Sequence, residues 1–389
     1  MSKEKRRVPK LRFPGFTEDW ERRKLTSFTQ RVKGNDGRMD LPTLTISASE
    51  GWLNQKDRFS ANIAGSEQKN YTLLRQGELS YNHGNSKLAK YGVVYALQEY
   101  KEALVPRVYH SFKVDESHDA LFVEYYFSTK RPDRELRKLI SSGARMDGLL
   151  NIGYDEFTNI SISLPTFSEQ KQIVALLKVC NKNITVHQRK IEHLNLKKKA
   201  LLQKLFPQNG ECYPEHRFPG FTDAWEQRKF VDLFEYERPD AYIVKSDNYN
   251  DKFNMPVLTA NKAFILGYTN EKNSYDKPSI IFDDFTLDRK YVDFPYMLKS
   301  SAIKILTSKS QHNLRFLFER LNATRFEVLG HARHYISVVQ NTTTLCPSFE
   351  EEVCISNLLT KFDELLTLHQ RKLEHLQFQK KALLQQLFI

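Results

Sequence analysis

The segment that most nearly resembles a catalytic site is Asp283-Asp284, followed by Asp288-Arg289-Lys290. A carboxylate pair near an Asp-x-Lys unit is one pattern of metal-dependent nucleases, because two-metal hydrolysis needs carboxylates that converge on one site. Here the carboxylates are only a few residues apart, and no Pro-Asp pair precedes them as in the common nuclease motif. We therefore expect a turn between two strands, and a stand-alone metal-dependent nuclease is the less favoured alternative.

Histidines in the two longest helical patterns have the wrong spacing to share a metal ion. His187 and His193 are six residues apart, as are His369 and His375. Six residues rotate a helix by about 240°, whereas an i, i+4 pair lies on one face. The cysteines form no C-x-x-C pair and no zinc-finger set with histidine, and they are Cys180, Cys212, Cys346 and Cys354. We predict no metal site, and these cysteines suit a reducing compartment.

Motifs for nucleotide and methyl-transfer chemistry are absent. The chain has no GxxxxGK[ST] loop, no GxGxxG after a strand, and no Asn-Pro-Pro-Tyr or Asp-Pro-Pro-Tyr tetrapeptide of an amino-methyltransferase. No run approaches 18 apolar residues, and no apolar core follows the basic N-terminal residues as in a signal peptide. We expect a cytoplasmic protein that is not an enzyme by itself, holds no cofactor and contacts no membrane.

Basic and hydrogen-bonding side chains form small clusters that could contact nucleic acid. The net charge is +12, but residues 168–206 carry +7 and residues 350–389 carry −1, so solvated lysines on one helix explain much of the excess. Arg, Lys, Asn and His hold phosphates or read base edges, although each alone is more often an ordinary surface residue. The candidate DNA-binding residues are Tyr81, Asn82, His83, Lys87, Lys90, Arg145, Arg289, Lys290 and Arg333.

The elements that must position these side chains are repeated within the chain. His187–Phe206 recurs at His369–Phe388 with 15 of 20 positions identical and an offset of 182. Apolar positions leading through both copies are spaced alternately four and three residues apart, which predicts two long helices with a heptad seam. The predicted seam comprises Ile173, Leu177, Ile184, Ile191, Leu194, Leu201, Leu205, Ile355, Leu359, Phe362, Leu366, Leu373, Leu376, Leu383 and Leu387.

Polar residues interrupt both seams at matching places, at His187 and Lys198 in the first and at His369 and Lys380 in the second. Such residues either set the register of a coiled coil or face a partner helix, and the sequence leaves both interpretations open. Each helix begins with a predicted capping box after a proline, Thr166–Glu169 in the first and Ser348–Glu351 in the second. Pro207 ends the first helix.

A second repeat precedes each variable region. Arg12–Leu25 recurs as Arg217–Phe230 with 10 of 14 positions identical and an offset of 205. Pro14-Gly15 predicts a turn, and we expect Phe13, Phe16 and Trp20 to be buried rather than to stack on bases. The predicted segments are a basic leader (1–24), a variable region (25–164), a spacer helix (165–207), a linker with the repeated leader (208–230), a second variable region (231–345) and a second spacer helix (346–389).

Both variable regions mix short strands with a helix. Runs of β-branched and aromatic residues predict strands at Thr43–Ser47, Glu78–Tyr81, Tyr91–Tyr95, Tyr109–Val114, Ile160–Leu164, Ser279–Phe282, Ala302–Leu306 and Tyr335–Val339. Helices are predicted at Asp119–Lys130 and near His312–Leu321. The regions end with related signals, Gly143-Ala144-Arg145 and Gly330-His331-Ala332-Arg333, and otherwise differ.

These features predict an α+β protein with two mixed α/β domains separated by two long helices. An internal duplication usually packs around a pseudo-twofold axis, which favours an antiparallel intramolecular coiled coil. A 33-residue seam is about 50 Å long, and one turn of B-DNA is about 34 Å. Domains at opposite ends of such a rod would contact two separated parts of one duplex.

The duplicated FPGFT-x-x-WE leader, the divergent inserts and the two HQRK[IL]EHL helices resemble the specificity (S) subunit of type I restriction–modification systems. The resemblance covers essentially the whole chain, although the second helix entry reads Phe349-Glu350-Glu351-Glu352 where the first has Phe167-Ser168-Glu169-Gln170. It implies that each insert is a target recognition domain, which reads one half of a bipartite site in double-stranded DNA.

The resemblance also implies partners. The helices would set the gap between the half-sites and recruit two modification (methyltransferase) subunits, and restriction subunits would join the full complex. Those partners would use S-adenosylmethionine, ATP and Mg, and the complex would carry the adenine methyltransferase and endonuclease activities. The alternatives are a coiled-coil protein scaffold without DNA specificity and the stand-alone nuclease.

Overall fold

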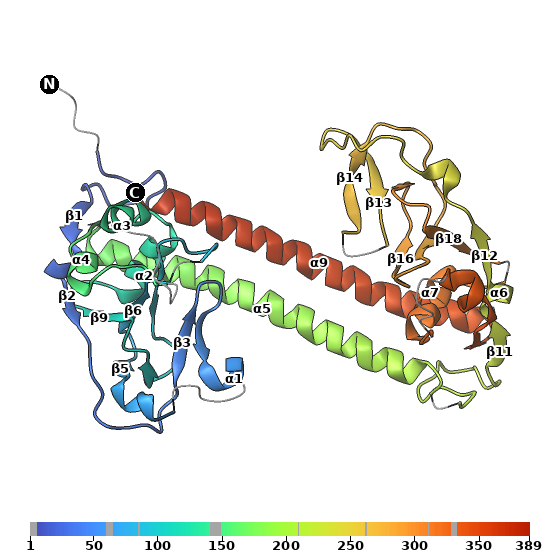
Figure 1. Cartoon of the computed structure of the whole chain (residues 1–389), viewed down its shortest axis with the longest axis horizontal. Helices are drawn as coiled ribbons and strands as arrows, with labels where there is room; N and C mark the ends of the chain where they lie inside the picture. Colours follow the sequence, from blue (N-terminus) through green and yellow to red (C-terminus); the bar gives the residue numbers. More distant parts are fainter. Residues whose placement is uncertain are drawn as a thin grey trace. The chain divides into compact units, whose positions relative to one another are not determined.

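The structure is a computed structural model that describes residues 6–59, 65–84, 86–140, 149–208, 210–260, 263–309, 311–327 and 333–389. It divides into two compact units (Figure 1). Unit 1 comprises Met1–Gln188 and Arg371–Ile389, and unit 2 comprises Arg189–Gln370. Each unit therefore joins one variable region to parts of both long helices.

Unit 1 is built on a four-stranded antiparallel sheet in the order β2-β9-β6-β7. Its strands are β2 (Thr29–Arg31), β6 (Leu79–Asn82), β7 (Val93–Ala96) and β9 (His110–Val114). Helix α2 (Ala120–Ser128) packs on β7, and the Asp119 carboxylate caps it by accepting hydrogen bonds from the Leu121 and Phe122 N–H groups. The predicted strands and helix in this part of the chain are thus confirmed, with ends shifted by one or two residues.

Smaller elements complete unit 1. Two strand pairs, β3 with β4 and β5 with β8, are antiparallel. The bounds are β3 (Leu44–Ser47), β4 (Gly51–Asn54), β5 (Thr72–Arg75), β8 (Glu102–Val105), α1 (Gln55–Phe59), α3 (Asp133–Leu139), α4 (Tyr154–Thr158), and the 3-10 turns η1 (Leu25–Ser27) and η2 (Gly65–Asn70).

Unit 2 repeats the same sheet, in the order β12-β18-β15-β16. Its strands are β12 (Phe234–Glu237), β15 (Ser279–Asp283), β16 (Arg289–Val292) and β18 (Ile303–Ser308). Helix α7 (Leu314–Ala323) is capped by the side chain of Asn313, which accepts a hydrogen bond from the Phe316 N–H group. The shared strand order shows that the two variable regions have one framework.

A second sheet distinguishes unit 2, with the order β14-β13-β17. The remaining bounds are β13 (Met255–Leu258), β14 (Ile265–Thr269), β17 (Met297–Leu298), α6 (Phe230–Leu233), α8 (His334–Ser337), η3 (Asp240–Tyr242) and η4 (Val339–Asn341). The predicted strand at Tyr335–Val339 is wrong, because this segment is the end of α8 and the start of η4. Its first residue is fully buried on the sheet of unit 2, so its aromatic and β-branched composition reflects packing and not strand pairing.

The repeated leader adds a strand to each unit. Strand β1 (Glu21–Lys24) pairs antiparallel with β10 (Ser161–Leu164), and β11 (Glu226–Lys229) pairs in the same way with β19 (Thr343–Cys346). The turn before each strand needs glycine, since Gly15 has a φ of +92° and the equivalent glycine has a φ of +94°. Each leader thereby closes its variable region where the long helix begins.

The long helices are α5 (Phe167–Leu205) and α9 (Phe349–Leu387), each of 39 residues. Unit 1 contains the start of α5 and the end of α9, whereas unit 2 contains the start of α9 and the end of α5 (Figure 1). The helices consequently run in opposite directions, as predicted.

Aromatic packing at the helix ends is repeated in the two units. In unit 1, Trp20, Phe122 and Phe388 form edge or tilted ring contacts. In unit 2 the corresponding contacts join Trp225, Phe316 and Phe206. Both tryptophans are buried, with exposed fractions of 1% and 2%, which confirms the predicted burial of Trp20, whereas Phe13 and Phe16 are half-buried.

The start of each long helix is fixed by an ion pair that the sequence did not predict. The Arg12 guanidinium donates two hydrogen bonds of 2.9 Å to the Glu169 carboxylate, and Arg217 binds Glu351 in the same bidentate way at 2.9 and 2.8 Å. In each predicted capping box only the N-cap hydroxyl contact is observed, at 3.4 Å from the Glu N–H group. The glutamate instead binds the arginine of the leader.

Burial follows the predicted seam along both helices. Every predicted seam residue is buried or half-buried. Between residues 185 and 200 the positions that are not exposed are His187, Ile191, Leu194 and Lys198, spaced four, three and four residues apart. Within the described part of the chain, no helix has the length and apolar character needed to span a bilayer.

Candidate nucleic-acid interface

The candidate residues of unit 1 surround the end of β6. Tyr81 is fully buried, its ring stacks on Phe157 at a centroid distance of 4.3 Å, and its hydroxyl donates to the Tyr91 carbonyl. Burial raises the pKa of this phenol well above its usual range. A side chain without exposed surface cannot touch a base, so the placement of Tyr81 among the DNA-binding residues is corrected to a core role.

His83 also belongs to the interior, with an exposed fraction of 6%. Its Nδ1 lies 2.8 Å from the Leu150 carbonyl oxygen, and its Nε2 lies 2.8 Å from that of Val108. The ring stacks on His110, whose pKa burial lowers to about 4. Both ring nitrogens face backbone oxygens, so the DNA-binding assignment of His83 is likewise corrected: it holds the segment at residue 150 against the strand end.

The remaining candidates of this cluster are accessible. Lys87 and Lys90 are exposed, and Asn82 is half-buried with its amide donating to the Ile46 carbonyl and accepting from the Gly84 N–H group. Asn82 lines a hollow of about 500 Å³ whose lining also includes hydroxyl-bearing residues, among them Thr45, Ser47, Ser86 and Tyr109. The hollow and the two lysines present hydrogen-bonding groups beside positive charge. Arg145 lies outside the described residues.

A basic hollow in unit 1 has no counterpart among the sequence-based candidates. It measures about 410 Å³, and its charged lining residues are Arg31, Lys33, Asp36, Arg75, Glu78 and Lys113. The guanidinium of Arg31 also stacks on the Tyr154 ring at 4.4 Å. The four cations come from separate strands and loops, so only β2, β5 and β9 folding together bring them to one place. Such a cluster can hold phosphates.

In unit 2 the acidic pair has a structural role. Asp284 is 1% exposed; its carboxylate accepts a hydrogen bond of 2.8 Å from the Tyr335 N–H group and lies 3.5 Å from the Lys304 ammonium. Asp283 caps the following turn by accepting from the Phe285 and Thr286 N–H groups. The two carboxylates do not converge on a solvent-accessible site, which removes the nuclease alternative and confirms the predicted turn.

Asp284 also determines where Arg333 lies. The Asp284 carbonyl accepts a hydrogen bond of 3.1 Å from the His334 N–H group, so exposed Arg333 directly precedes the contact with the turn between β15 and β16. Exposed Lys290 follows that turn. The structure therefore brings these two predicted residues to the same end of the sheet.

Arg289 is occupied within the protein. Its guanidinium donates 2.8 and 3.3 Å hydrogen bonds to the side chain and backbone of Asn322 and lies 5.6 Å from the centre of the Phe326 ring. Burial lowers the pKa of this group. Arg289 joins β16 to the end of α7, and Lys290 and Arg333 are left as the accessible candidates of unit 2.

The two strand ends are equivalent. The pairing registers place Leu79 of β6 and Ile280 of β15 at matching positions, and His83 and Asp284 each lie four residues later. Each of these two side chains binds the segment that follows a Gly-x-Ala-Arg or Gly-Ala-Arg signal. One framework therefore presents different chemistry at the same place in two units.

The lysines in the seams also have defined environments. Lys198 lies 2.6 Å from Asp363 and 3.6 Å from Glu319, and Arg315 contacts the same two carboxylates. Lys380 lies beside Glu124 in a cavity of about 360 Å³ in unit 1. Burial lowers the pKa of Lys380 and raises that of Glu124 to about 7. Lys198 thus forms ion pairs within its unit.

Comparison with known proteins identifies the framework. The family model described as the type I restriction modification DNA specificity domain matches residues 222–377. The specificity subunit of the type I restriction enzyme EcoR124I/EcoR124II from Escherichia coli is 43% identical over 114 residues, which are 27% of this chain and 28% of that protein. The MjaVIII specificity subunit from Methanocaldococcus jannaschii is 22% identical over 312 residues, 68% of each chain.

The fold has a solved counterpart. The S subunit of a type I restriction–modification system from M. genitalium superimposes with a TM-score of 0.65 at 14% sequence identity, covering 98% of this chain and 99% of that one. At this identity the likeness concerns the fold. Residues 222–377 thus match the DNA specificity domain of type I restriction–modification systems, and the chain has the fold of the M. genitalium S subunit.

Proposed function

We propose that this chain is the DNA specificity subunit of a type I restriction–modification complex and that each unit reads one half of a bipartite site. The observation that carries the proposal is the repeated framework with different side chains at equivalent strand ends, His83 in one unit and Asp284 in the other. Residues 25–164 and 231–345 would be the target recognition domains. Asn82, Lys87, Lys90, Arg145, Lys290 and Arg333 are the proposed DNA contacts, together with the basic hollow around Arg31.

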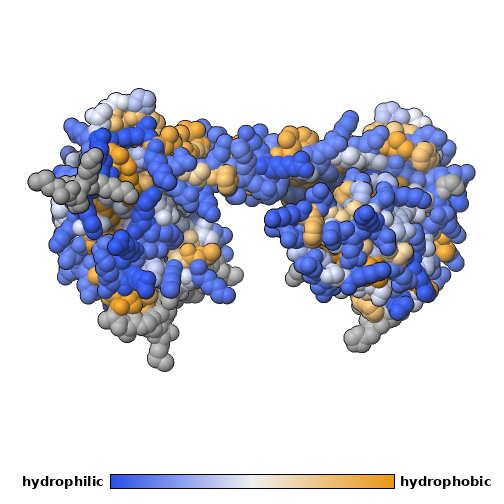
Figure 2. Space-filling model, turned by 90° about the horizontal axis from the view of Figure 1, so that it is seen from above, coloured by the Kyte–Doolittle hydropathy of each residue, from blue (hydrophilic) through white to orange (hydrophobic). Residues whose placement is uncertain are grey.

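The long helices are proposed to set the gap between half-sites and to bind two copies of one modification subunit. Apolar side chains are exposed at matching helix positions: Leu196 and Phe378, 182 residues apart, are 67% and 71% exposed. Val186 and Leu368, with the same offset, are 40% and 61% exposed. Figure 2 shows hydrophobic patches within the mostly hydrophilic surface. A repeated apolar position suits one kind of partner bound twice.

The partners would supply the chemistry. Modification subunits would use S-adenosylmethionine to methylate adenine, and restriction subunits would use ATP and Mg to translocate and cut. The described side chains of this chain support binding and not catalysis, because the acidic pair nearest to a nuclease pattern accepts hydrogen bonds that stabilise the fold. The likeness to S subunits disfavours a coiled-coil scaffold without DNA specificity.

Mapping methylated adenines tests the proposed reading directly. DNA would be sequenced for N6-methyladenine after expression of the chain with its modification subunit in cells that lack other methyltransferases. We expect one bipartite motif with a constant gap. Exchange of residues 231–345 for the corresponding insert of another S subunit should change one half of that motif; a change in both halves contradicts modular reading.

The role of the helices as spacers is tested separately. Deletion of one heptad from α5 should shorten the gap or abolish methylation, because seven residues remove about 10 Å of helix. Methylation at an unchanged gap would exclude the spacer role. For partner binding, Leu196→Asp and Phe378→Asp should each remove one modification subunit from the complex, as counted by native mass spectrometry. Asn195 is exposed next to Leu196, so Asn195→Asp is the control and should leave two subunits bound.

A further inference from the structure

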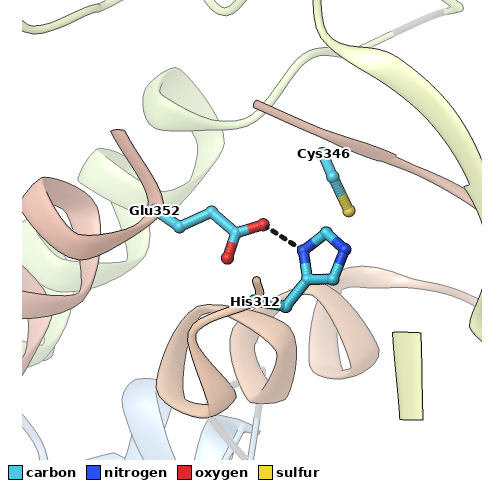
Figure 3. A group of neighbouring side chains, drawn as sticks. All are labelled: His312, Cys346 and Glu352. Carbon is cyan, nitrogen blue, oxygen red and sulfur yellow. Dashed lines mark hydrogen bonds and ion pairs between the residues drawn. The ribbon is translucent and has the colours of Figure 1, made fainter. Parts of the chain in front are cut away.

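Three metal-binding side chain types meet inside unit 2. His312 precedes α7, Cys346 ends β19, and Glu352 lies in the first turn of α9. Their potential ligand atoms all lie within 4.8 Å of one another, and the His312 Nδ1 is 2.9 Å from a Glu352 oxygen. Figure 3 shows the thiol and the carboxylate pointing toward the imidazole from separate elements. Cys346 is 2% exposed and Glu352 is fully buried.

The equivalent place in unit 1 shows which part of this arrangement the fold requires. There Gln170 accepts a 3.0 Å hydrogen bond from the Asp119 N–H group, just as Glu352 accepts one of 2.6 Å from the Asn313 N–H group. A neutral amide therefore suffices to join the long helix to the start of the short helix that precedes it in the chain. The carboxylate charge of Glu352 is not needed for that contact.

The other two positions differ in the same direction. The strand register makes Leu164 of unit 1 equivalent to Cys346 of unit 2. A histidine precedes both short helices, but His118 binds the Asp115 carboxylate at 2.6 Å on its own loop. Unit 2 thus replaces a leucine and a glutamine by a thiol and a carboxyl group and turns its histidine toward them. Burying both ionisable groups is costly unless a cation balances them.

The chemistry of the three side chains selects the cation. A thiolate and an imidazole are ligands of zinc, and a carboxylate is a common third ligand. A divalent ion bound by one thiolate, one carboxylate and a neutral imidazole has no net charge, which suits a buried position. In the metal-free protein, burial raises the pKa of the Cys346 thiol to about 12 and also raises that of Glu352.

We propose that His312, Cys346 and Glu352 bind one Zn²⁺ ion that ties the start of α7 to α9 and β19. Bonds of about 2.0–2.3 Å bring neighbouring ligand atoms to roughly 3.5 Å, so the side chains would move by about 1 Å from their present positions. One Glu352 oxygen would stay with the Asn313 N–H group while the other binds the ion in place of the histidine proton. The fourth ligand would be a water molecule or another small donor.

Metal analysis of the full chain tests the site. The protein, without a histidine tag and with the exposed Cys212 replaced by serine to remove an adventitious thiol, would be equilibrated with zinc, passed through a desalting column and analysed for bound metal. We expect one zinc ion per chain and a Tm that rises with zinc concentration. With Co²⁺ instead, a thiolate-to-cobalt charge-transfer absorption should appear.

Two variants make the result specific. Cys346→Ser should remove the charge-transfer absorption and weaken zinc binding by roughly tenfold or more. Glu352→Gln should also weaken binding while the protein stays folded, because Gln170 shows that an amide preserves the helix contact. Cys354→Ser, on the same helix but outside the cluster, should bind zinc as the parent does. Absence of bound zinc in the parent, or undiminished binding by folded Cys346→Ser, would overturn the proposal.

Discussion

At the place where Tyr125 hydrogen-bonds to Asn181 in unit 1, unit 2 has Glu319 and Asp363 bridged by Arg315. The two pairs are equivalent by the helix repeat and the N-caps of α2 and α7. By contrast, the ion pairs from leader to long helix and the aromatic triads at the helix ends are the same in both units. The contacts that hold the leader and the ends of the long helices together are therefore the same in both units. The side chains at the Tyr125 and Glu319 positions differ.

The difference has a physical reason. Framework contacts bury a tryptophan and a bidentate ion pair, where nearly any substitution leaves a void or an unpaired charge. At the Tyr125 and Glu319 positions, either a neutral hydrogen-bonded pair or a network of charged side chains can satisfy the polar groups. The following substitutions break or sharpen this comparison, from the largest expected effect to the smallest.

Loss of a leader arginine should have the largest effect. Arg217→Ala leaves the Glu351 carboxylate, which is 1% exposed, without its cation, so the free energy of unfolding of unit 2 should fall by about 3–5 kcal/mol. Arg12→Ala should do the same to unit 1 through Glu169. Urea unfolding of each variant, monitored by hydrogen exchange in the two units separately, measures both losses of stability. Arg228→Ala, which breaks an exposed pair, should cost less than about 1 kcal/mol. Equal losses from Arg228 and Arg217 would contradict a framework role.

Asp284→Asn should cost about 2–3 kcal/mol, because it leaves the buried Lys304 ammonium without a nearby negative charge. It should also release the segment after Arg333 and weaken recognition of the half-site assigned to unit 2. Thermal unfolding and adenine methylation at variant half-sites measure the two effects. His83→Ala should act only on the other half-site; if Asp284→Asn also altered that half-site, independent reading by the two units would be wrong.

Two glutamates beside the seam lysines should respond oppositely to neutralisation. Glu319 has two cationic partners, so Glu319→Gln should destabilise the protein by about 1–2 kcal/mol at pH 8. Glu124 is half-buried beside a single lysine, Lys380, and burial still raises its pKa to about 7, so Glu124→Gln should stabilise the protein by about 2 kcal/mol at the same pH.

The raised pKa of Glu124 determines the direction in which the stability of the protein changes with pH. Its folded pKa of about 7 exceeds the ordinary value of 4.5, so the folded protein binds the proton more tightly. The resulting stability is fully present below pH 4.5 and is lost as the pH rises through about 7. The advantage of Glu124→Gln should therefore shrink from pH 8 to pH 5. Chemical unfolding across this range measures it, and a pH-independent difference would show that the carboxyl is solvated.

Tyr126→Phe should have the smallest effect, about 1 kcal/mol. The Tyr126 hydroxyl donates to the Ile389 carbonyl and accepts from the Ser163 N–H group, and its loss leaves two backbone groups to find water. The equivalent residue in unit 2 is Arg320, which binds Thr344 instead. Thermal unfolding measures the cost; a loss above about 3 kcal/mol would place Tyr126 in the framework.

The repeats were the strongest signal in the sequence because they record which residues a shared framework needs. Period and offset alone located both long helices and the seam from Ile173 to Leu387, and the aromatic residues beside the Pro14-Gly15 turn predicted the burial of Trp20. Local patterns also located most central strands. They failed at Tyr335, because a buried aromatic next to β-branched residues has the same composition in a short helix packed on a sheet as in a strand.

The sequence by itself determined the duplicated layout and the two long helices, since repeats and helix periodicity can be found from the order of the residues alone. Tertiary structure alone decided which candidate residues are accessible. His83 carries a polar group expected of a DNA contact and Asp284 a carboxylate expected of a nuclease site, yet each is buried by a segment more than 50 residues away. The basic hollow around Arg31 and the cluster of His312, Cys346 and Glu352 were invisible for the same reason. In the hollow, Arg31, Arg75 and Lys113 are 38 to 82 residues apart, and in the cluster His312 is 34 and 40 residues from Cys346 and Glu352, so only strand pairing and helix packing bring them together.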